Sequence, residues 1–405
     1  MRLCQSWRLR KMVQKIPASG LENAGGNFKN LLINGDFLIW ERGTSAATVT
    51  ASSSLGTYMA DRWQTWEFND GTLTQEQSAL DNDDFETTGQ RNALLVKCTG
   101  TDTSISAAQF ALISQVIEAQ NCQGLQWGTD NAKNVTLSFW VKSNLTGTFT
   151  AVIRKIDQTF YYIPKEYTIN SANTWEKKII TYGPGDTNGD VLKASAGAID
   201  NNNGEGLWVQ FSLSLGSNFH GTAGAWANAV TSLGTSNQTN FMSSTSNNFY
   251  LAGCQLEIGD TASDFEHLPR DITENRCLRY YYRQQSTDTA SSYYPCFGSG
   301  IANHATQISC YVANPVRPRT ERSIAYSGSV KVYGGLGDSD TPGYTGWASV
   351  NFYDGTLSSL VQPNVASGLT VNRPALILVQ NDASAYIEYD CEFNSAGTRT
   401  ASGGS

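Results

Sequence analysis

Acidic side chains are the residues of this sequence whose spacing could support chemistry. Two carboxylates at a suitable separation are sufficient to hydrolyse a glycosidic bond, and four acidic residues lie close together at Asp81, Asp83, Asp84 and Glu86. The segment Asp186-Thr-Asn-Gly-Asp190 begins like a calcium-binding loop, but no glycine follows Asp190 and no glutamate closes the loop. We therefore expect the acidic cluster to be a solvated loop and the second segment to be a hairpin turn.

Residue types for other kinds of catalysis are scarce. The three histidines are His220, His267 and His304, and the sequence contains no nucleophile-elbow, phosphate-loop, zinc-protease or dinucleotide-binding motif. A glycan-cleaving enzyme built on carboxylates is the catalytic alternative that stays open. We expect a protein without catalytic activity, resident metal or cofactor.

Composition and charge narrow the class of protein further. The net charge of −8 argues against nucleic-acid binding, which requires clustered Lys and Arg. No segment approaches the roughly 20 apolar residues of a membrane helix. Only 16% of the residues are charged, while 37 Gly and many aromatic residues are present. This composition suits an all-β protein of short strands and tight turns.

The first 20 residues differ from the rest of the chain. They carry five basic residues and no acidic one, at Arg2, Arg8, Arg10, Lys11 and Lys15. They lack the apolar core of a signal peptide. Two interpretations stay open, an anchoring peptide that folds on a partner or a true translation start at Met12. We expect residues 1–29 to form a basic anchoring segment and linker.

The eight cysteines are scattered and form no C-x-x-C pair, which argues against a zinc or redox motif. Buried free thiols are expected. A disulfide between Cys296 and Cys310 is the alternative.

Alternating side chains predict β-strands along most of the chain. Between Val135 and Val141, apolar residues alternate with Thr136, Ser138 and Trp140, and the same period of two recurs over residues 207–215. Further strand-like runs lie at 149–156, 175–182 and 249–258. Two segments favour a helix: residues 108–120, where a strand is equally open, and residues 272–283, which Thr273 would cap. Strands without regular intervening helices predict an antiparallel sandwich.

A second β-rich unit follows a break in the pattern. Residues 284–292 show no periodicity, and strand-like runs resume at 307–312, 329–333, 348–353, 375–380 and 385–393. We therefore place one domain at residues 30–283 and a smaller β-rich tip domain at residues 284–405.

Two motifs at the ends of the first domain carry a resemblance to a known family. The opening motif comprises Asn30-Leu-Leu-Ile-Asn-Gly-Asp-Phe37, Trp40, Arg42-Gly-Thr and Tyr58-Met-Ala-Asp-Arg-Trp63. The closing motif comprises Cys254-Gln-Leu-Glu-Ile-Gly-Asp260, Ala262, Phe265-Glu266, Pro269 and Cys277-Leu-Arg-Tyr-Tyr281. Together they resemble the jelly-roll domain, similar to carbohydrate-binding modules, of bacteriophage tail-fibre and receptor-binding proteins. The segment Asn314-Pro-Val-Arg-Pro-Arg-Thr320 resembles a turn of the tip that follows this domain in such proteins, although its residues depart from the usual pattern.

The resemblance implies a fold, partners and a role. It implies an antiparallel jelly roll followed by a tip, assembled as a homotrimer in the virion after synthesis in the host cytoplasm. The N-terminal segment would attach to a phage tail adaptor or another virion protein, and the tip would bind a host cell-surface glycan. A purely structural virion component, such as a capsid decoration or tail connector, is the alternative of a different class.

Aromatic residues in the tip are the candidates for receptor binding. Tyr333, Tyr344, Trp347 and Tyr353 flank the polar, Gly-rich loop at 334–346, and aromatic faces among hydroxyls and amides suit sugar rings. The same residues could instead be core or trimer contacts. In the first domain, Trp140 and Trp208 could line a groove or bury a subunit interface.

The motif residues themselves predict structural roles. Asn34-Gly35 predicts a turn or bulge with positive φ, at which Asp36 could accept backbone donors. Asp61-Arg62-Trp63 places a carboxylate, a planar cation and an indole together, which favours a locked corner over chemistry.

Overall fold

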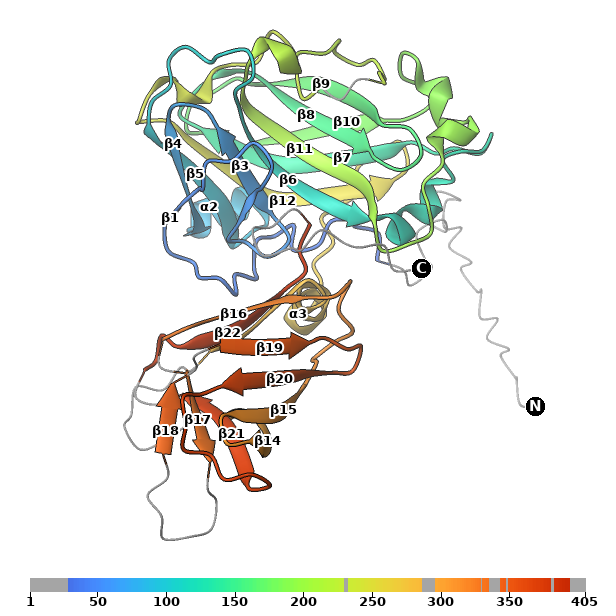
Figure 1. The fold of residues 1–405 in the computed structure, drawn as a ribbon. Coiled ribbons are helices and arrows are strands. Elements are labelled where there is room, and N and C mark those ends of the chain that lie inside the picture. Colours follow the sequence, from blue (N-terminus) through green and yellow to red (C-terminus); the bar gives the residue numbers. More distant parts are fainter. Residues whose placement is uncertain are drawn as a thin grey trace, which may run out of the picture.

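The first domain is built from two antiparallel sheets that pack face to face (Figure 1). The computed structural model describes residues 28–228, 232–285, 296–328, 330–334, 343–346, 349–379 and 382–393. Within these residues the two sheets have six strands each, in the orders β1-β4-β5-β12-β7-β10 and β2-β3-β6-β11-β8-β9. The chain crosses repeatedly between the two sheets, and the hairpins β2-β3, β4-β5 and β8-β9 each stay within one sheet. The predicted antiparallel jelly roll is confirmed.

The strands of the first sheet, in spatial order, are β1 (Ala47–Thr48), β4 (Thr72–Ala79), β5 (Asn92–Gly100), β12 (Asn248–Ile258), β7 (Val135–Ser143) and β10 (Glu176–Tyr182). Those of the second are β2 (Thr57–Tyr58), β3 (Gln64–Phe68), β6 (Phe110–Glu118), β11 (Glu205–Leu215), β8 (Gly147–Lys155) and β9 (Tyr161–Ile169). The helices are α2 (Asn82–Thr88) and α3 (Arg270–Leu278), and short 3-10 turns lie at Ala119–Leu125, Gly189–Leu192, Ser195–Gly197, Ser217–Phe219 and Phe241–Ser243.

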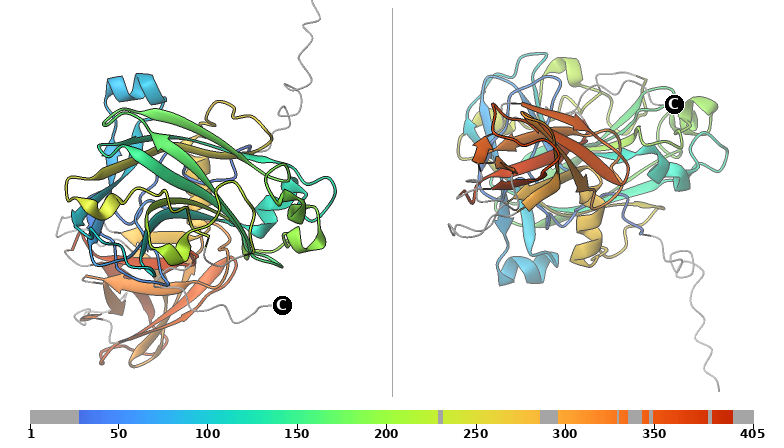
Figure 2. Two further views of the ribbon diagram at one scale, coloured as in Figure 1. Left: turned by 90° about the horizontal axis from the view of Figure 1, so that it is seen from above. Right: turned by 60° about the horizontal axis from the view of Figure 1, so that its bottom comes forward.

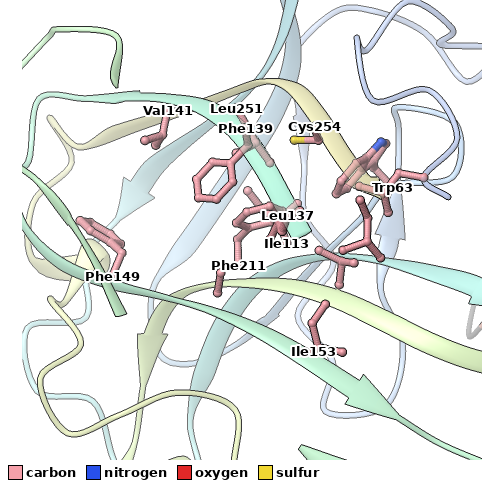
Figure 3. Packing of buried hydrophobic residues seen from close by; sticks show 14 of the residues in the cluster. Trp63, Ile113, Leu137, Phe139, Val141, Phe149, Ile153, Phe211, Leu251 and Cys254 are labelled. Atoms are coloured by element: carbon pink, nitrogen blue, oxygen red, sulfur yellow. The ribbon is translucent and has the colours of Figure 1, made fainter. Parts of the chain in front are cut away.

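The core of the jelly roll lies between the two sheets (Figure 3). Strand β7 contributes the apolar set of its alternating sequence, including Leu137 and Phe139, and β11 faces it with Phe211. The ring of Phe139 lies 4.8 Å from that of Phe211 and 5.1 Å from that of Tyr167, both edge to face. This geometry is favourable for aromatic pairs and holds the sheets in one register.

Helical segments depart from the sequence-based expectations in two places. Residues 108–120 contain strand β6, and the helix predicted near residue 272 exists as α3. The predicted cap at Thr273 is wrong, because α3 begins at Arg270 and Thr273 lies buried inside it. The expected acidic loop is instead helix α2, whose first turn is capped when the Asp81 side chain accepts a hydrogen bond from the backbone N–H of Asp84.

The opening and closing motifs of the jelly roll contact each other directly. The carboxylate of Glu266 accepts hydrogen bonds from the backbone N–H groups of Lys29 and Asn30, at 3.2 and 3.0 Å. Asn30 in turn donates to the carbonyl of Cys254, and the N–H of Cys254 donates to the carbonyl of Gly35. Asn34 has the predicted positive φ, of 58°. A Cβ at Gly35 would lie 2.0 Å from the Cys254 carbonyl oxygen, so only glycine fits there.

The second domain contains two further sheets below the jelly roll in Figure 1. A three-stranded sheet, in the order β13 (Tyr281–Gln285), β22 (Tyr386–Asp390) and β16 (Ser323–Ser327), lies next to the jelly roll. The other sheet has seven strands among the described residues. In spatial order they are β18 (Gly343–Gly346), β17 (Val330–Gly334), β21 (Pro374–Val379), β14 (Cys296–His304), β15 (Gln307–Ala313), β20 (Ser358–Asn364) and β19 (Ser349–Tyr353).

The seven-stranded sheet must curl strongly. Its two edge strands, β18 and β19, are consecutive in the chain, and only residues 347 and 348 separate them. Three Cα steps of about 3.8 Å cannot span more than about 11 Å. The sheet therefore bends until its edges approach each other, and its inner face encloses the second hydrophobic core, which includes Val332, Cys310 and Ile377.

A buried ion pair joins the two domains. The guanidinium of Arg62, in the jelly roll, pairs with the carboxylate of Glu392, whose second oxygen accepts a bond from the backbone N–H of Arg62 at 3.2 Å. The same guanidinium donates to the carbonyl of Val116 at 2.6 Å and lies 3.4 Å from the ring centroid of Tyr280. The predicted locked corner at Asp61-Arg62-Trp63 therefore exists, and its partner is the second domain.

Further contacts extend the junction between the two domains. Arg42 pairs with Asp390 at 3.0 Å and stacks on the ring of Tyr281 at 3.4 Å. The hydroxyl of Tyr58 donates to the carbonyl of Phe393 at 2.6 Å. Burial alone would raise the pKa of Glu118, but the Arg279 guanidinium bound to it holds that pKa below its usual value. Figure 2 shows the second domain against the jelly roll from two further sides.

The predicted domain boundary can be compared with the strands of the structure. The predicted boundary between residues 283 and 284 falls within β13, which pairs with β22 of the second domain.

The seven cysteines of the described residues are free thiols, with Cys296 exposed and the others buried. The alternative disulfide between Cys296 and Cys310 is therefore absent. No helix in the described segments is long and apolar enough to cross a membrane.

Candidate functional site

A row of tyrosine and leucine side chains crosses the outer face of the seven-stranded sheet. Residues directly opposite each other in paired strands share a face, and the pairings connect six positions from strand to strand. We call this row the tyrosine belt, and its members in spatial order are Tyr333, Leu376, Ser299, Tyr311, Leu360 and Tyr353. Their sequence neighbours Val332, Cys310 and Val361 are buried in the core, so the belt faces outward.

The belt is most accessible over strands β15, β20 and β19. Tyr311 is 67% exposed and Tyr353 is 57% exposed, with half-buried Leu360 between them. The next row on the same face is polar, since Gln362 donates to the hydroxyl of Ser309 at 2.8 Å. Exposed rings beside hydroxyl and amide groups can stack on a sugar face while bonding its hydroxyls.

The four predicted receptor residues fall in different parts of the sheet. Tyr333 and Tyr353 belong to the belt, near its opposite ends. The backbone of Tyr344 pairs with that of Tyr333, whereas Trp347 and the loop at 335–342 lie outside the described residues. Tyr311 is a further candidate for receptor binding that was not predicted from the sequence. Its alternation with the buried residues Cys310 and Val312 is the local signal of an outward side chain. Only strand register places it in one row with Tyr353, across Leu360.

Trp140 and Trp208 do not share a groove. Trp140 is half-buried on the outer face of the first sheet, near Trp175 and Tyr250. Trp208 lies on the outer face of the second sheet and is buried, together with Trp66, in a cluster that reaches Tyr280 and Phe393 at the domain junction. The prediction that Trp208 lines an open groove or a subunit interface is therefore wrong, because other parts of the same chain cover it.

The acidic candidates make structural contacts. Asp84 pairs with Lys142 at 3.0 Å and accepts a bond from the indole N–H of Trp175 at 2.8 Å. Asp186 accepts a bond from the backbone N–H of Gly183 and pairs with Lys165. The predicted hairpin turn is wrong, because β10 and β11 on either side of this segment belong to different sheets and Gly189–Leu192 form a 3-10 turn. Burial raises the pKa of Asp36, which accepts the backbone donors predicted for it. In the part of the chain that is described, no three His, Cys, Asp or Glu side chains could hold a metal ion.

Comparison with known proteins gives similarity at the level of architecture. No protein-family model and no curated protein matches this sequence. A putative sugar-binding protein from Bacteroides thetaiotaomicron has a TM-score of 0.30 and 14% identity over 56% of this chain and 99% of its own. The family 11 carbohydrate-binding module from Clostridium thermocellum has a TM-score of 0.25 and 12% identity, again over 56% and 99%.

A phage protein is also among the similar structures. The enzymatically active domain of Bacteriophage CBA120 tailspike protein 4 has a TM-score of 0.27 and 12% identity over 57% of this chain, but only 21% of that chain is covered. These similarities concern the jelly-roll architecture, which the two six-stranded sheets establish by themselves.

Proposed function

We propose that this chain is a non-enzymatic attachment protein of a phage virion that binds a host cell-surface glycan through the tyrosine belt. The observation that carries the proposal is the outward row of Tyr311, Leu360 and Tyr353, because solvent-exposed aromatic rings on a rigid sheet are available for a partner and contribute nothing to the core. The basic N-terminal segment, residues 1–29, would attach the protein to the virion.

The arrangement of the domains supports this role. The buried ion pair of Arg62 and Glu392 fixes the belt relative to the jelly roll, so a bound receptor is held at a constant orientation. Individual glycan sites are weak, and a homotrimer would present three belts whose high effective concentration increases the avidity. A trimer is part of the proposal.

Replacing Tyr311 and Tyr353 together by alanine is expected to reduce attachment to host cells by about ten-fold or more, because exposed aromatic anchors dominate such interfaces. The measurement is saturable binding of the fluorescently labelled full-length protein to candidate host bacteria. Tyr326→Ala, on β16 of the same domain and outside the belt, is the matched control and should bind like the unmodified protein.

The same experiment separates the alternative functions. If the belt variant remains folded, keeps its oligomeric state and attaches as well as the unmodified protein, the belt is not the receptor site. If the belt variant changes the oligomeric state instead, the tyrosines bury a subunit interface and the structural role is favoured. Release of reducing sugar ends from host polysaccharide would establish a depolymerase.

A further inference from the structure

A pocket lies between the two domains, away from the tyrosine belt. Its volume is about 260 Å³, just below the usual range of ligand pockets, which suits a single sugar ring. One wall is the loop at residues 50–58 of the jelly roll, with Leu55 and Tyr58. The floor is the three-stranded sheet, which contributes Ser323 and Ala325 from β16 and Glu388 and Asp390 from β22. In Figure 1 this loop hangs below β1, towards β16 and β22.

Strand register brings the polar floor groups together. Ser323 lies opposite Asp390, and Ala325 lies opposite Glu388, so the four side chains share one face of the sheet. The Oε2 atom of Glu388 accepts bonds from the hydroxyl of Tyr281 at 2.5 Å and from Arg283 at 2.8 Å. Its Oε1 atom has no hydrogen-bond partner among the described residues and remains an acceptor for a hydroxyl group.

The pocket is formed before any ligand binds. Arg42, in its lining, is held between Asp390 and the ring of Tyr281 and has a side chain only 10% exposed. The loop wall is braced by its own hydroxyl groups, since Ser52 accepts bonds from the N–H groups of Ser54 and Leu55. Thr57 accepts a bond from the N–H of Thr50 at 2.8 Å. A ligand therefore loses little affinity to ordering of the protein.

We propose that this pocket is a second saccharide site, which binds one neutral sugar residue. Leu55, Tyr58 and Ala325 offer an apolar surface to the C–H face of a pyranose ring, while Glu388 and Ser323 bond its hydroxyls. The cations of the site are already paired, Arg42 with Asp390 and Arg283 with Glu388, so the carboxylate of a uronic or sialic acid would lose water there without gaining a counter-charge. The site deepens the proposed function, since it would hold a terminal or branching sugar of the glycan that the belt binds.

Ala325→Trp tests the proposal by filling the pocket. Ala325 lies on the pocket floor and is exposed, so the larger side chain should fill the pocket without disturbing the fold. The probes are glucose, galactose, mannose, rhamnose and N-acetylglucosamine, with glucuronate as the acidic comparison, measured by saturation-transfer NMR and calorimetry on the full-length protein. We expect at least one neutral sugar to bind and glucuronate not to bind, and we expect Ala325→Trp to abolish the binding. Glu388→Gln should weaken it by about ten-fold.

Two controls keep this result separate from the proposed function. Tyr326→Trp introduces the same residue one position along β16, on the opposite face of the strand, and should bind sugar normally. The belt variant with Tyr311 and Tyr353 replaced by alanine should also keep pocket binding. Failure of every neutral sugar to bind, or unchanged binding by Ala325→Trp, would overturn the pocket proposal. Loss of cell attachment by the belt variant bears on the belt alone.

Discussion

Replacing Glu392 by alanine is expected to lower the free energy of unfolding by about 3–5 kcal/mol. The Arg62 and Glu392 side chains are 1% and 0% exposed, so the substitution would leave a guanidinium buried without its counter-charge. It would also remove the acceptor of the Arg62 backbone N–H. The remaining contacts, to the Val116 carbonyl and the Tyr280 ring, cannot balance the charge. Urea denaturation followed by tryptophan fluorescence measures the loss.

Two further variants show whether the buried charge is the cause. Exchanging both Arg62 and Glu392 for methionine removes the charges as a pair, and should recover most of the stability lost in the single variant. Arg270→Ala breaks an exposed pair with Glu274 and should change stability by no more than about 0.5 kcal/mol. A Glu392→Ala protein within about 1 kcal/mol of the unmodified one would show that this ion pair does not hold the junction.

Glu67 is expected to make the protein less stable as the pH rises. Burial between the sheets raises the pKa of Glu67 from 4.5 to about 7, although its carboxylate accepts a bond from the N–H of Leu73. The folded state therefore favours the protonated form. The contribution of Glu67 to the free energy of unfolding is greatest below about pH 4.5, decreases as the pH rises from 4.5 through 7, and is constant above that. The shift corresponds to a loss on the order of 3 kcal/mol.

Glu67→Gln should remove this pH dependence, because glutamine keeps the shape and stays neutral. The variant is expected to match the unmodified protein near pH 4.5 and to be more stable at pH 8, as measured by urea unfolding across that range. Glu86→Gln, at an exposed position of α2, is the matched control, because it exchanges the same residue types without changing a buried carboxylate. Parallel stability curves for the unmodified and Glu67→Gln proteins would contradict the prediction.

The strands and the jelly roll could be predicted because their signal is local. The alternation of Val135, Leu137, Phe139 and Val141 is a direct consequence of a strand with one face in the core, and the structure places it in β7. The opening and closing motifs could also be recognised from the sequence. Their residues have a structural role, because Glu266 accepts a bond from Asn30 and so joins the first and last parts of the domain.

The belt and the junction could not be predicted, because both depend on pairing between distant residues. Tyr311 and Tyr353 become neighbours only through Leu360, and no local pattern fixes that register. Arg62 meets Glu392 across 330 positions of sequence. The corner at Arg62 could therefore be predicted, but its partner could not. Trp208 was misjudged for the same reason, since its cover comes from remote segments.

The chain enters and leaves the second domain at adjacent points. Tyr281, at the start of β13, lies directly opposite Asp390, at the end of β22, so the two crossings are separated by one interstrand spacing of about 5 Å. A domain connected in this way can be replaced as a unit. Residues between this pair could be exchanged for another tip, with a new receptor specificity, while the jelly roll stays unchanged. Such an exchange keeps the acids that pair with Arg42 and Arg62, because Asp390 and Glu392 lie outside the exchanged residues.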